Sequence, residues 1–264
     1  MNERFSYSTL HLMVLVLLHL SLTVASADDA NTTDDAETTE PAVDVAGVQF
    51  ADDFSYAAGA KYIQEDVTGL DIDHELHGNI YTFVQLPPVV RGHLRLIMTE
   101  DDTVEGPDGQ PGVLRMEIAE IPQVTVISGF AYQGNEANGK ITMPGWKRGE
   151  LTMNDLRRAF VTFRFRAENR EDPDAFGAKF RLNFQPGLEN GATAAADFGV
   201  LIATSRWRTF RRPIASAENL TAFLETVNGE NPESFKLVWS QAEPITSYRP
   251  GDSLLIDDLE ITIE

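Results

Sequence analysis

Apolar and polar residues alternate at every second position through most of the chain after Val48. A period of two residues is typical of a β-strand with one buried face. Alternating or short apolar runs of strand length lie at 79–86, 93–99, 113–118, 123–130, 160–167, 179–184, 197–203, 235–240 and 255–263. Helical periodicity is confined to two short pieces, 152–158 and 217–226. Many short strands with little helix predict an all-β fold, an antiparallel β-sandwich of the jelly-roll type, over residues 46–264.

An acidic stretch separates the runs at 93–99 and 113–118. It contains the sequence Gly-Pro-Asp-Gly at 106–109, a strong turn signal, so the two runs are predicted to pair as a hairpin with a long acidic loop. The five acids of residues 100–108 do not have the spacing of an EF-hand. We therefore interpret this loop as solvated rather than metal-binding.

The chain begins with a pattern typical of export. Arg4 precedes a short apolar run at 10–24, and the triplet Ala-Ser-Ala follows at 25–27. These features predict a secretory signal peptide over residues 1–27, with an uncleaved membrane anchor as the alternative. Residues 28–45 are rich in Asp, Thr and Ala and contain no aromatic residue, so they are predicted to form a disordered acidic linker.

The charge of the chain is strongly negative but unevenly distributed. The formal net charge is −20, which argues against general binding to nucleic-acid phosphates. Residues 147–212 nevertheless hold eight acids and thirteen bases, a basic island in an acidic molecule. The chain has no cysteine, so an exported domain must be held together by its core or by a bound metal rather than by disulfides.

The second half of the sequence contains an ordered set of segments. They are AFVTFRFRAE (159–168), KFRLNFQPG (179–187), SRWRTFRRPI (205–214), SFKLVWS (234–240) and GDSLLIDDLEITIE (251–264). This order resembles the jelly-roll carbohydrate-binding modules of bacterial polysaccharide-degrading proteins, the CenC-type modules of the galactose-binding-like group. The resemblance covers residues 159–264. It implies a non-catalytic carbohydrate-binding domain, secreted or in the cell envelope, with a polysaccharide or glycan as its partner.

The closing segment carries a pair of acids. If Leu259 and the alternate residues after it face the core, Asp257 points the same way and Asp258 points outward. A carboxylate on the core side needs partners, either backbone N–H groups or a hard cation. The family resemblance implies a structural Ca²⁺ between the first and last strands. Asp52, Asp53 and Asp257 are the candidate metal ligands.

Sugar binding requires flat aromatic faces beside hydrogen-bonding groups. Trp146 lies in the loop-like segment Met-Pro-Gly-Trp-Lys-Arg-Gly, and Tyr132 lies close to a Gly-Asn pair, so both are candidate ligand-binding residues with exposed rings. Simple packing of the loop is the alternative for Trp146. Trp207 and Trp239 are expected to pack against other residues rather than bind a ligand.

Several polar residues of the basic island fall on the outward side of predicted strands. Arg164, Arg166, Arg181 and Asn183 are candidate ligand-binding residues for an acidic polysaccharide, provided that their strands are neighbours. Two alternatives leave these residues without a ligand. Either cross-strand acids balance the arginines, or the acidic segment 28–45 covers them.

No catalytic constellation stands out in the sequence. Asp71, Asp73 and Glu75 resemble the acidic strand of laminarinase-like glycosidases, but the last acid misses that spacing by one residue. The sequence contains no nucleophile elbow, P-loop or zinc quartet. A jelly-roll glycosidase or polysaccharide lyase, and a structural surface or matrix protein, are the alternatives to a non-catalytic carbohydrate-binding domain.

Overall fold

The computed structural model describes residues 46–54, 61–64, 72–76, 80–85, 95–120, 127–135, 138–169, 179–188, 194–243 and 247–264. The predicted signal peptide, the predicted acidic linker and Asp71 lie outside the described residues. Among the helices in these ranges, none has the length and apolar character that a membrane crossing requires.

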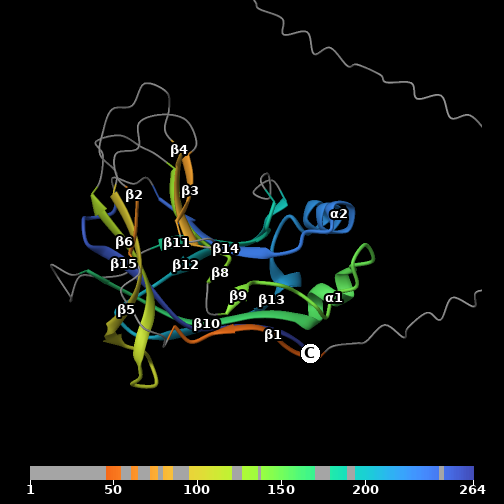
Figure 1. Ribbon diagram of the computed structural model, residues 1–264, viewed down its shortest axis with the longest axis horizontal. Coiled ribbons are helices and arrows are strands. Elements are labelled where there is room, and N and C mark those ends of the chain that lie inside the picture. The colour runs from red at the N-terminus through yellow and green to blue at the C-terminus, as the bar shows by residue number, and fades with distance from the viewer. Residues whose placement is uncertain are drawn as a thin grey trace, which may run out of the picture. The chain divides into compact units, whose positions relative to one another are not determined.

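The described strands form two larger antiparallel sheets and one small hairpin (Figure 1). Sheet A contains β1 (Gly47–Asp52), β2 (Lys61–Gln64), β5 (Arg95–Glu105), β6 (Pro111–Glu120), β10 (Ala159–Asn169), β13 (Arg208–Pro213) and β15 (Asp252–Ile263). Sheet B contains β3 (Ile72–Leu76), β4 (Ile80–Gln85), β7 (Ile127–Tyr132), β11 (Lys179–Pro186), β12 (Ala196–Ile202) and β14 (Phe235–Gln241). The hairpin pairs β8 (Gly134–Asn135) with β9 (Gly139–Lys140). The helices are α1 (Met153–Arg158), α2 (Leu220–Glu230) and a 3-10 turn at Ile214–Ser216.

The strand order confirms the predicted antiparallel jelly-roll sandwich. Sheet A has the order β13-β10-β15-β6-β5-β2, with β1 also paired to β15, and sheet B has the order β12-β11-β14-β7-β4-β3. The chain therefore passes repeatedly from one sheet to the other, and sequential strands such as β10 and β11 lie in different sheets. The predicted hairpin is also confirmed, because β5 pairs with β6 on either side of the turn at 106–110.

The core forms because each strand buries every second residue. In β10, Val161, Phe163 and Phe165 are buried and the residues between them are partly exposed. The ring of Phe163 lies 5.9 Å from that of Trp239 on β14, so this contact joins the two sheets. Trp239 is fully buried, which confirms its predicted packing role. Burial of such a side chain stabilises the fold by about 2–3 kcal/mol.

β15 contains a bulge that interrupts the alternation. Thr162 of β10 pairs with Glu260 of β15, and Arg164 pairs with Asp257. Two steps along β10 therefore correspond to three steps along β15. The additional residue is Asp258, whose φ of 49° is in the left-handed region. A bulge of this kind inserts one unpaired residue and shifts the alternation beyond it by one position.

The bulge lies where β15 changes its neighbour on one edge. β6 pairs with β15 from Asp252 to Ile256, and β1 pairs with it from Leu259 to Ile263. Asp257 and Asp258 fall between these two registers. The sheet therefore has a local gap in pairing beside two consecutive carboxylates.

Candidate functional site

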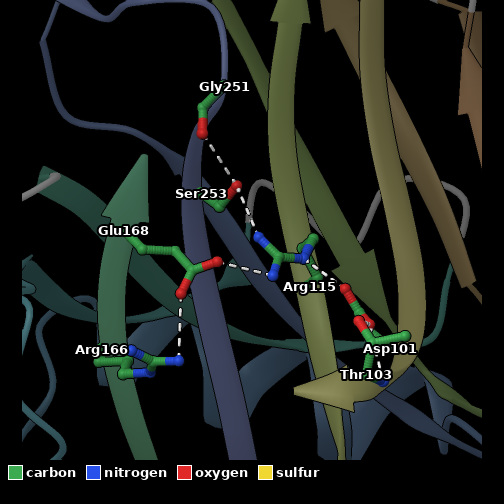
Figure 2. A network of polar contacts seen from close by, with 7 residues as sticks. All are labelled: Asp101, Thr103, Arg115, Arg166, Glu168, Gly251 and Ser253. Atoms are coloured by element: carbon green, nitrogen blue, oxygen red, sulfur yellow. Dashed lines mark hydrogen bonds and ion pairs between the residues drawn. The ribbon is translucent and has the colours of Figure 1, made fainter. Parts of the chain in front are cut away.

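A buried charge network crosses the outward face of sheet A (Figure 2). Arg115 on β6 follows the core residue Leu114, so it lies on the opposite face of the sheet, although only 3% of it is exposed. Its guanidinium pairs with Asp101 at 2.7 Å and with Glu168 at 2.6 Å. Glu168 also pairs with Arg166 at 3.1 Å. The network thus alternates acid and base across β5, β6 and β10.

Asp101 is held in its ionised form by this network. Burial raises the pKa of its carboxyl, but hydrogen bonds from Thr103 and Arg115 lower the pKa more, so it lies below its ordinary value. The prediction of a solvated acidic loop is wrong at this residue. β5 continues through Asp101 to Glu105, which places the carboxylate against Arg115 rather than in water.

The network ends at a tryptophan on the edge of sheet A. Trp207 lies in the loop between β12 and β13, and the guanidinium carbon of Arg166 lies 5.2 Å from the centroid of its ring. The loop is tied to β10 because the Ala167 N–H donates a hydrogen bond to the Thr204 carbonyl at 2.8 Å. The Trp207 ring is partly exposed.

Three further arginines lie near Trp207: two are its neighbours in the sequence, and the third is on β10. Arg206 and Arg208 flank Trp207 in the sequence and are exposed, and neither has a carboxylate partner within the part of the chain that the structure describes. Arg208 lies on the side of β13 that faces sheet B, where its guanidinium donates a hydrogen bond to the Ile202 carbonyl at 3.3 Å. Arg164, two residues from Arg166 on the same side of β10, pairs with Asp258 at 3.1 Å. The basic-aromatic patch, as it is named from here on, consists of Arg164, Arg166, Arg206, Trp207 and Arg208.

The prediction of a single cationic face that joins β10 and β11 is wrong. Arg164 and Arg166 lie in sheet A, whereas Arg181 and Asn183 lie in sheet B. The outward sides of two packed sheets face opposite directions, so the two pairs cannot contact one ligand face. Arg181 pairs with Asp197 of the neighbouring strand at 2.7 Å, as the alternative of balancing acids expects.

Trp146 is not the exposed loop ring that its local sequence predicts. It is 8% exposed, and its ring packs edge-to-face against Phe184, Phe223 and Phe235 at centroid distances of 6.4, 6.3 and 5.2 Å. These three partners come from β11, α2 and β14, far away in sequence. Trp146 nevertheless lines a pocket of about 410 Å³ near the end of α2.

Tyr132 also differs from its prediction, because it is the last residue of β7 and is fully buried. Its hydroxyl donates a hydrogen bond to Asp52, and the rings of Phe50 and Phe54 pack against its edge or face. The Phe54 N–H donates a second hydrogen bond to Asp52 at 2.9 Å. A ring in this position has no face to offer to a sugar.

The bulge in β15 reverses the predicted orientation of Asp257. Leu254, Ile256 and Leu259 belong to the core, so Asp257 lies on the outward side of the sheet. The carboxylate on the core side is Asp52, whose register partner is Leu259. Asp52 is satisfied by the hydrogen bonds described above and points away from the predicted metal position.

Asp257 lines an acidic pocket of about 340 Å³ together with Asp53, Asp108 and Asp258. The loop between β5 and β6 closes over it so tightly that a Cβ at Gly106 would overlap a carboxylate oxygen of Asp257. Asp257 is 3% exposed, and the Asp258 N–H donates a hydrogen bond to it at 2.8 Å. The pocket therefore collects carboxylates from the residue that follows β1, from β15 and from the β5–β6 turn.

These surroundings strongly change the ionisation of Asp257. Burial and the charges of Asp258, Asp108 and Asp53 raise its pKa to about 7, against the lowering effect of the Asp258 N–H. Carboxylate oxygens are the ligands that a hard cation such as Ca²⁺ prefers. As placed, however, no group of three or more His, Cys, Asp or Glu side chains within the described ranges is arranged to hold a metal ion.

Two functional candidates escaped the sequence reasoning. Trp207 was expected only to pack, and the available signal was the Arg-Trp-Arg triplet at 206–208, in which an arginine stands on each side of Trp207 in the sequence. Asp108 belongs to a turn that is distant in sequence from Asp257, and only the pairing of β6 with β15 brings the two together.

Comparisons with known proteins give weak likenesses. No family model matches the sequence, and no curated protein matches it. Among solved structures, it is similar to the N-terminal CBM22-1-CBM22-2 tandem domain of Paenibacillus barcinonensis Xyn10C, with 13% identity, a TM-score of 0.36, and coverage of 74% of this chain and half (50%) of that one.

Two other solved structures show a comparable likeness. A CBM4 structure is 12% identical with a TM-score of 0.32, and the match covers 70% of this chain and 87% of that one. A candidate glycoside hydrolase of Bacteroides vulgatus is 9% identical with a TM-score of 0.31, and the match covers 77% of this chain and 98% of that one. At these TM-scores the likenesses carry no argument about the ligand.

Proposed function

We propose that the protein is an exported, non-catalytic carbohydrate-binding domain whose basic-aromatic patch binds an acidic polysaccharide. The observation that carries the proposal is the partly exposed ring of Trp207, which lies against the guanidinium of Arg166 and has an exposed arginine on each side of it in the sequence. A flat ring offers an apolar face for the C–H groups of a sugar. Arginine offers paired donors to carboxylate or sulfate and keeps its charge at every physiological pH. The export pattern at 1–27 supports an extracellular or envelope location.

The charge distribution restricts where such a ligand can bind. The chain carries a net charge of −20, so most of its surface repels a polyanion. Arg206 and Arg208 have no carboxylate partner among the residues described, which leaves their charge available at the patch. Binding is therefore expected to be local and to weaken with salt.

The patch is also positioned before a ligand arrives. Arg166 is fixed by Glu168, and Glu168 is fixed in turn by the buried Arg115. Each side chain that is already ordered reduces the entropy lost on binding. Arg115 is thus a positioning residue for the patch and does not itself reach the surface.

The test is affinity electrophoresis of the full chain in gels that contain polygalacturonate, a sulfated galactan or neutral xylan. We expect retardation by the acidic polymers, lost in Trp207→Ala and weakened about tenfold or more in the double variant Arg206→Gln/Arg208→Gln. Arg181→Gln, on the other sheet, is the matched control and should bind as the unaltered chain does. Equal retardation of the patch variants and the control would remove the patch from the proposal.

The same incubations separate binding from catalysis. If the polymers are shortened, as measured by new reducing ends or by unsaturated uronate absorbance, a glycosidase or lyase replaces the non-catalytic function. If the polymers are neither bound nor shortened, the result favours the alternative that the protein is a structural surface protein.

We further propose that a structural Ca²⁺ binds in the acidic pocket, held by Asp53 and Asp257 with Asp108 and Asp258. The support is electrostatic: burial and, to a smaller extent, repulsion by Asp258, Asp108 and Asp53 raise the pKa of Asp257, and a divalent cation would relieve that repulsion. Asp52 would support the site from the core side through its hydrogen bond to the Phe54 N–H. To bind Ca²⁺, the carboxylates would have to move closer together than they are in this structure.

A further inference from the structure

Asp258 on β15 belongs to two neighbouring features of sheet A. It is the additional residue of the bulge, and its backbone has a φ of 49°. Its side chain lines the acidic pocket. A carboxylate oxygen of the same side chain, Oδ2, also lies 3.1 Å from Nε of Arg164, which belongs to the basic-aromatic patch. An acid of the chain itself therefore occupies one arginine of the patch.

The bulge explains why Asp258, and not Asp257, pairs with Arg164. Asp257 is the register partner of Arg164, but it is 3% exposed and its Oδ1 accepts a hydrogen bond from the Asp258 N–H at 2.8 Å. The register passes over Asp258, whose backbone takes a left-handed conformation that Asp and Asn adopt more readily than most residues. The additional residue thus brings a carboxylate to the partly exposed side chain of Arg164.

The two arginines that β10 contributes to the patch are held with different strength. The side chains of Arg164 and Asp258 are 41% and 38% exposed, and an ion pair in such contact with water contributes little to stability because solvent screens it. Arg166 pairs with Glu168, which is anchored in turn by the buried Arg115. Arg166 is therefore fixed, whereas Arg164 can exchange Asp258 for another acidic group.

Such an exchange reduces what an acidic ligand gains from Arg164. A carboxylate or sulfate of the ligand pairs with Arg164 only when the guanidinium gives up a partner of the same charge. The released Asp258 then lies beside the ligand as a like charge and repels it. Within the described ranges, Asp258 is the only carboxylate paired with Arg164, so the availability of this arginine depends on one acid.

We infer, on the basis of the proposed function, that Asp258 is an internal competitor of the acidic polysaccharide for Arg164. While Asp258 neutralises Arg164, the patch binds its ligand mainly through its other residues. Removal of the Asp258 carboxylate frees Arg164 for the ligand. Loss of this acid therefore increases the affinity for the polysaccharide, the opposite of the effect expected of Trp207→Ala.

The test measures the dissociation constant of the full chain for polygalacturonate by affinity electrophoresis, in chelator because Asp258 also lines the acidic pocket. The gels are run at about pH 8, above the pKa of Asp257 of about 7, so that Asp257 is largely ionised in every variant. We expect Asp258→Asn, which tolerates the left-handed backbone, to bind about threefold more tightly. Asp258→Gly, which also accepts a positive φ, should show the same gain, and neutral xylan should show none.

A second pair of variants shows whether the gain depends on Arg164. Arg164→Gln should weaken binding only slightly in the unaltered chain, but in Arg164→Gln/Asp258→Asn it should cancel the gain of about threefold. The matched control is Glu243→Gln, which changes the net charge by the same amount and breaks a similarly exposed pair on sheet B, with Lys179 41% and Glu243 40% exposed. It should leave the affinity unchanged.

The outcomes separate an error about Asp258 from an error about the patch. An equal gain in Glu243→Gln, no gain in either Asp258 variant, or a gain that persists without Arg164 would overturn the inference while the patch stands. If polygalacturonate retards neither the unaltered chain nor any variant, the proposed function fails and the inference fails with it.

Discussion

Two aspartates on the outward face of sheet A are buried to a similar extent but lie in opposite surroundings. Asp101 is 6% exposed and Asp257 is 3% exposed. Asp101 faces the guanidinium of Arg115, and its pKa lies below the ordinary value in spite of burial. Asp257 faces three other carboxylates, and its pKa is raised to about 7.

The difference shows that burial alone does not decide the charge state of a side chain. Burial disfavours the ionised form of both carboxylates, and the hydrogen bonds and charges around each one decide whether its pKa ends above or below the ordinary value. In the Arg115 network each charge has a partner of opposite sign, and Glu168, which pairs with Arg115, also holds Arg166 of the patch in place. In the acidic pocket Arg164 pairs with Asp258, but no basic side chain offsets the effect of burial on Asp257, whose raised pKa favours its protonated form.

The largest expected effect comes from removal of the buried cation. Arg115→Met leaves Asp101 and Glu168 without their shared partner in a site where Arg115 is 3% exposed. We expect the free energy of unfolding in urea to fall by about 3–5 kcal/mol. The matched control is Arg181→Met, which breaks an exposed pair and should cost about 1 kcal/mol or less. Equal losses in both variants would contradict the comparison.

The next effect concerns the pH dependence of the acidic pocket in the presence of a chelator. The pKa of Asp257 is higher in the folded chain than its ordinary value of 3.8, so its contribution to stability is complete below pH 4 and is lost as the pH rises through 7. Asp257→Asn should abolish this loss and raise the free energy of unfolding at pH 8 by about 2–3 kcal/mol. Parallel pH profiles for the variant and the unaltered chain would refute the raised pKa.

Asp101 predicts the opposite sign at acid pH. Its folded pKa lies below the ordinary value, so its contribution is present above pH 4 and is lost as the pH falls through the folded pKa. Asp101→Asn should therefore flatten the acid limb of the stability curve. Asp257→Asn should not flatten that limb. The two variants are compared by urea unfolding between pH 2 and 5, about the range in which carboxyl groups titrate.

The smallest effect is the response to calcium. At neutral pH, Ca²⁺ in tenfold excess over its dissociation constant should stabilise the chain by about 1.4 kcal/mol, measured as a shift in thermal melting against a chelator. Asp108→Asn should remove most of this shift, and Glu150→Gln, whose side chain pairs with Lys147, should not. Identical melting curves in Ca²⁺ and in chelator would contradict the proposed Ca²⁺ site.

The sheets were predictable because alternation is a local property, but three features of the site depend on other information. The orientation of Asp257 was predicted incorrectly because one additional residue at Asp258 shifts the alternation without disturbing its appearance. Trp146 lies in a segment with loop composition, and its burial depends on aromatic partners from distant elements. Arg164 and Arg181 have identical local patterns, and only the pairing of whole strands assigns them to different sheets.

The pairing of β1 with β15 has a consequence for how the molecule is assembled. Gly47 lies opposite Ile263, so the first described strand finds its place only when the last one is present. Closing so long a loop costs entropy before any contact compensates for it, and such non-local pairing slows folding. Until β15 is available, β1 lacks the strand with which it pairs, so the chain is most exposed to aggregation in the period before this last pairing step.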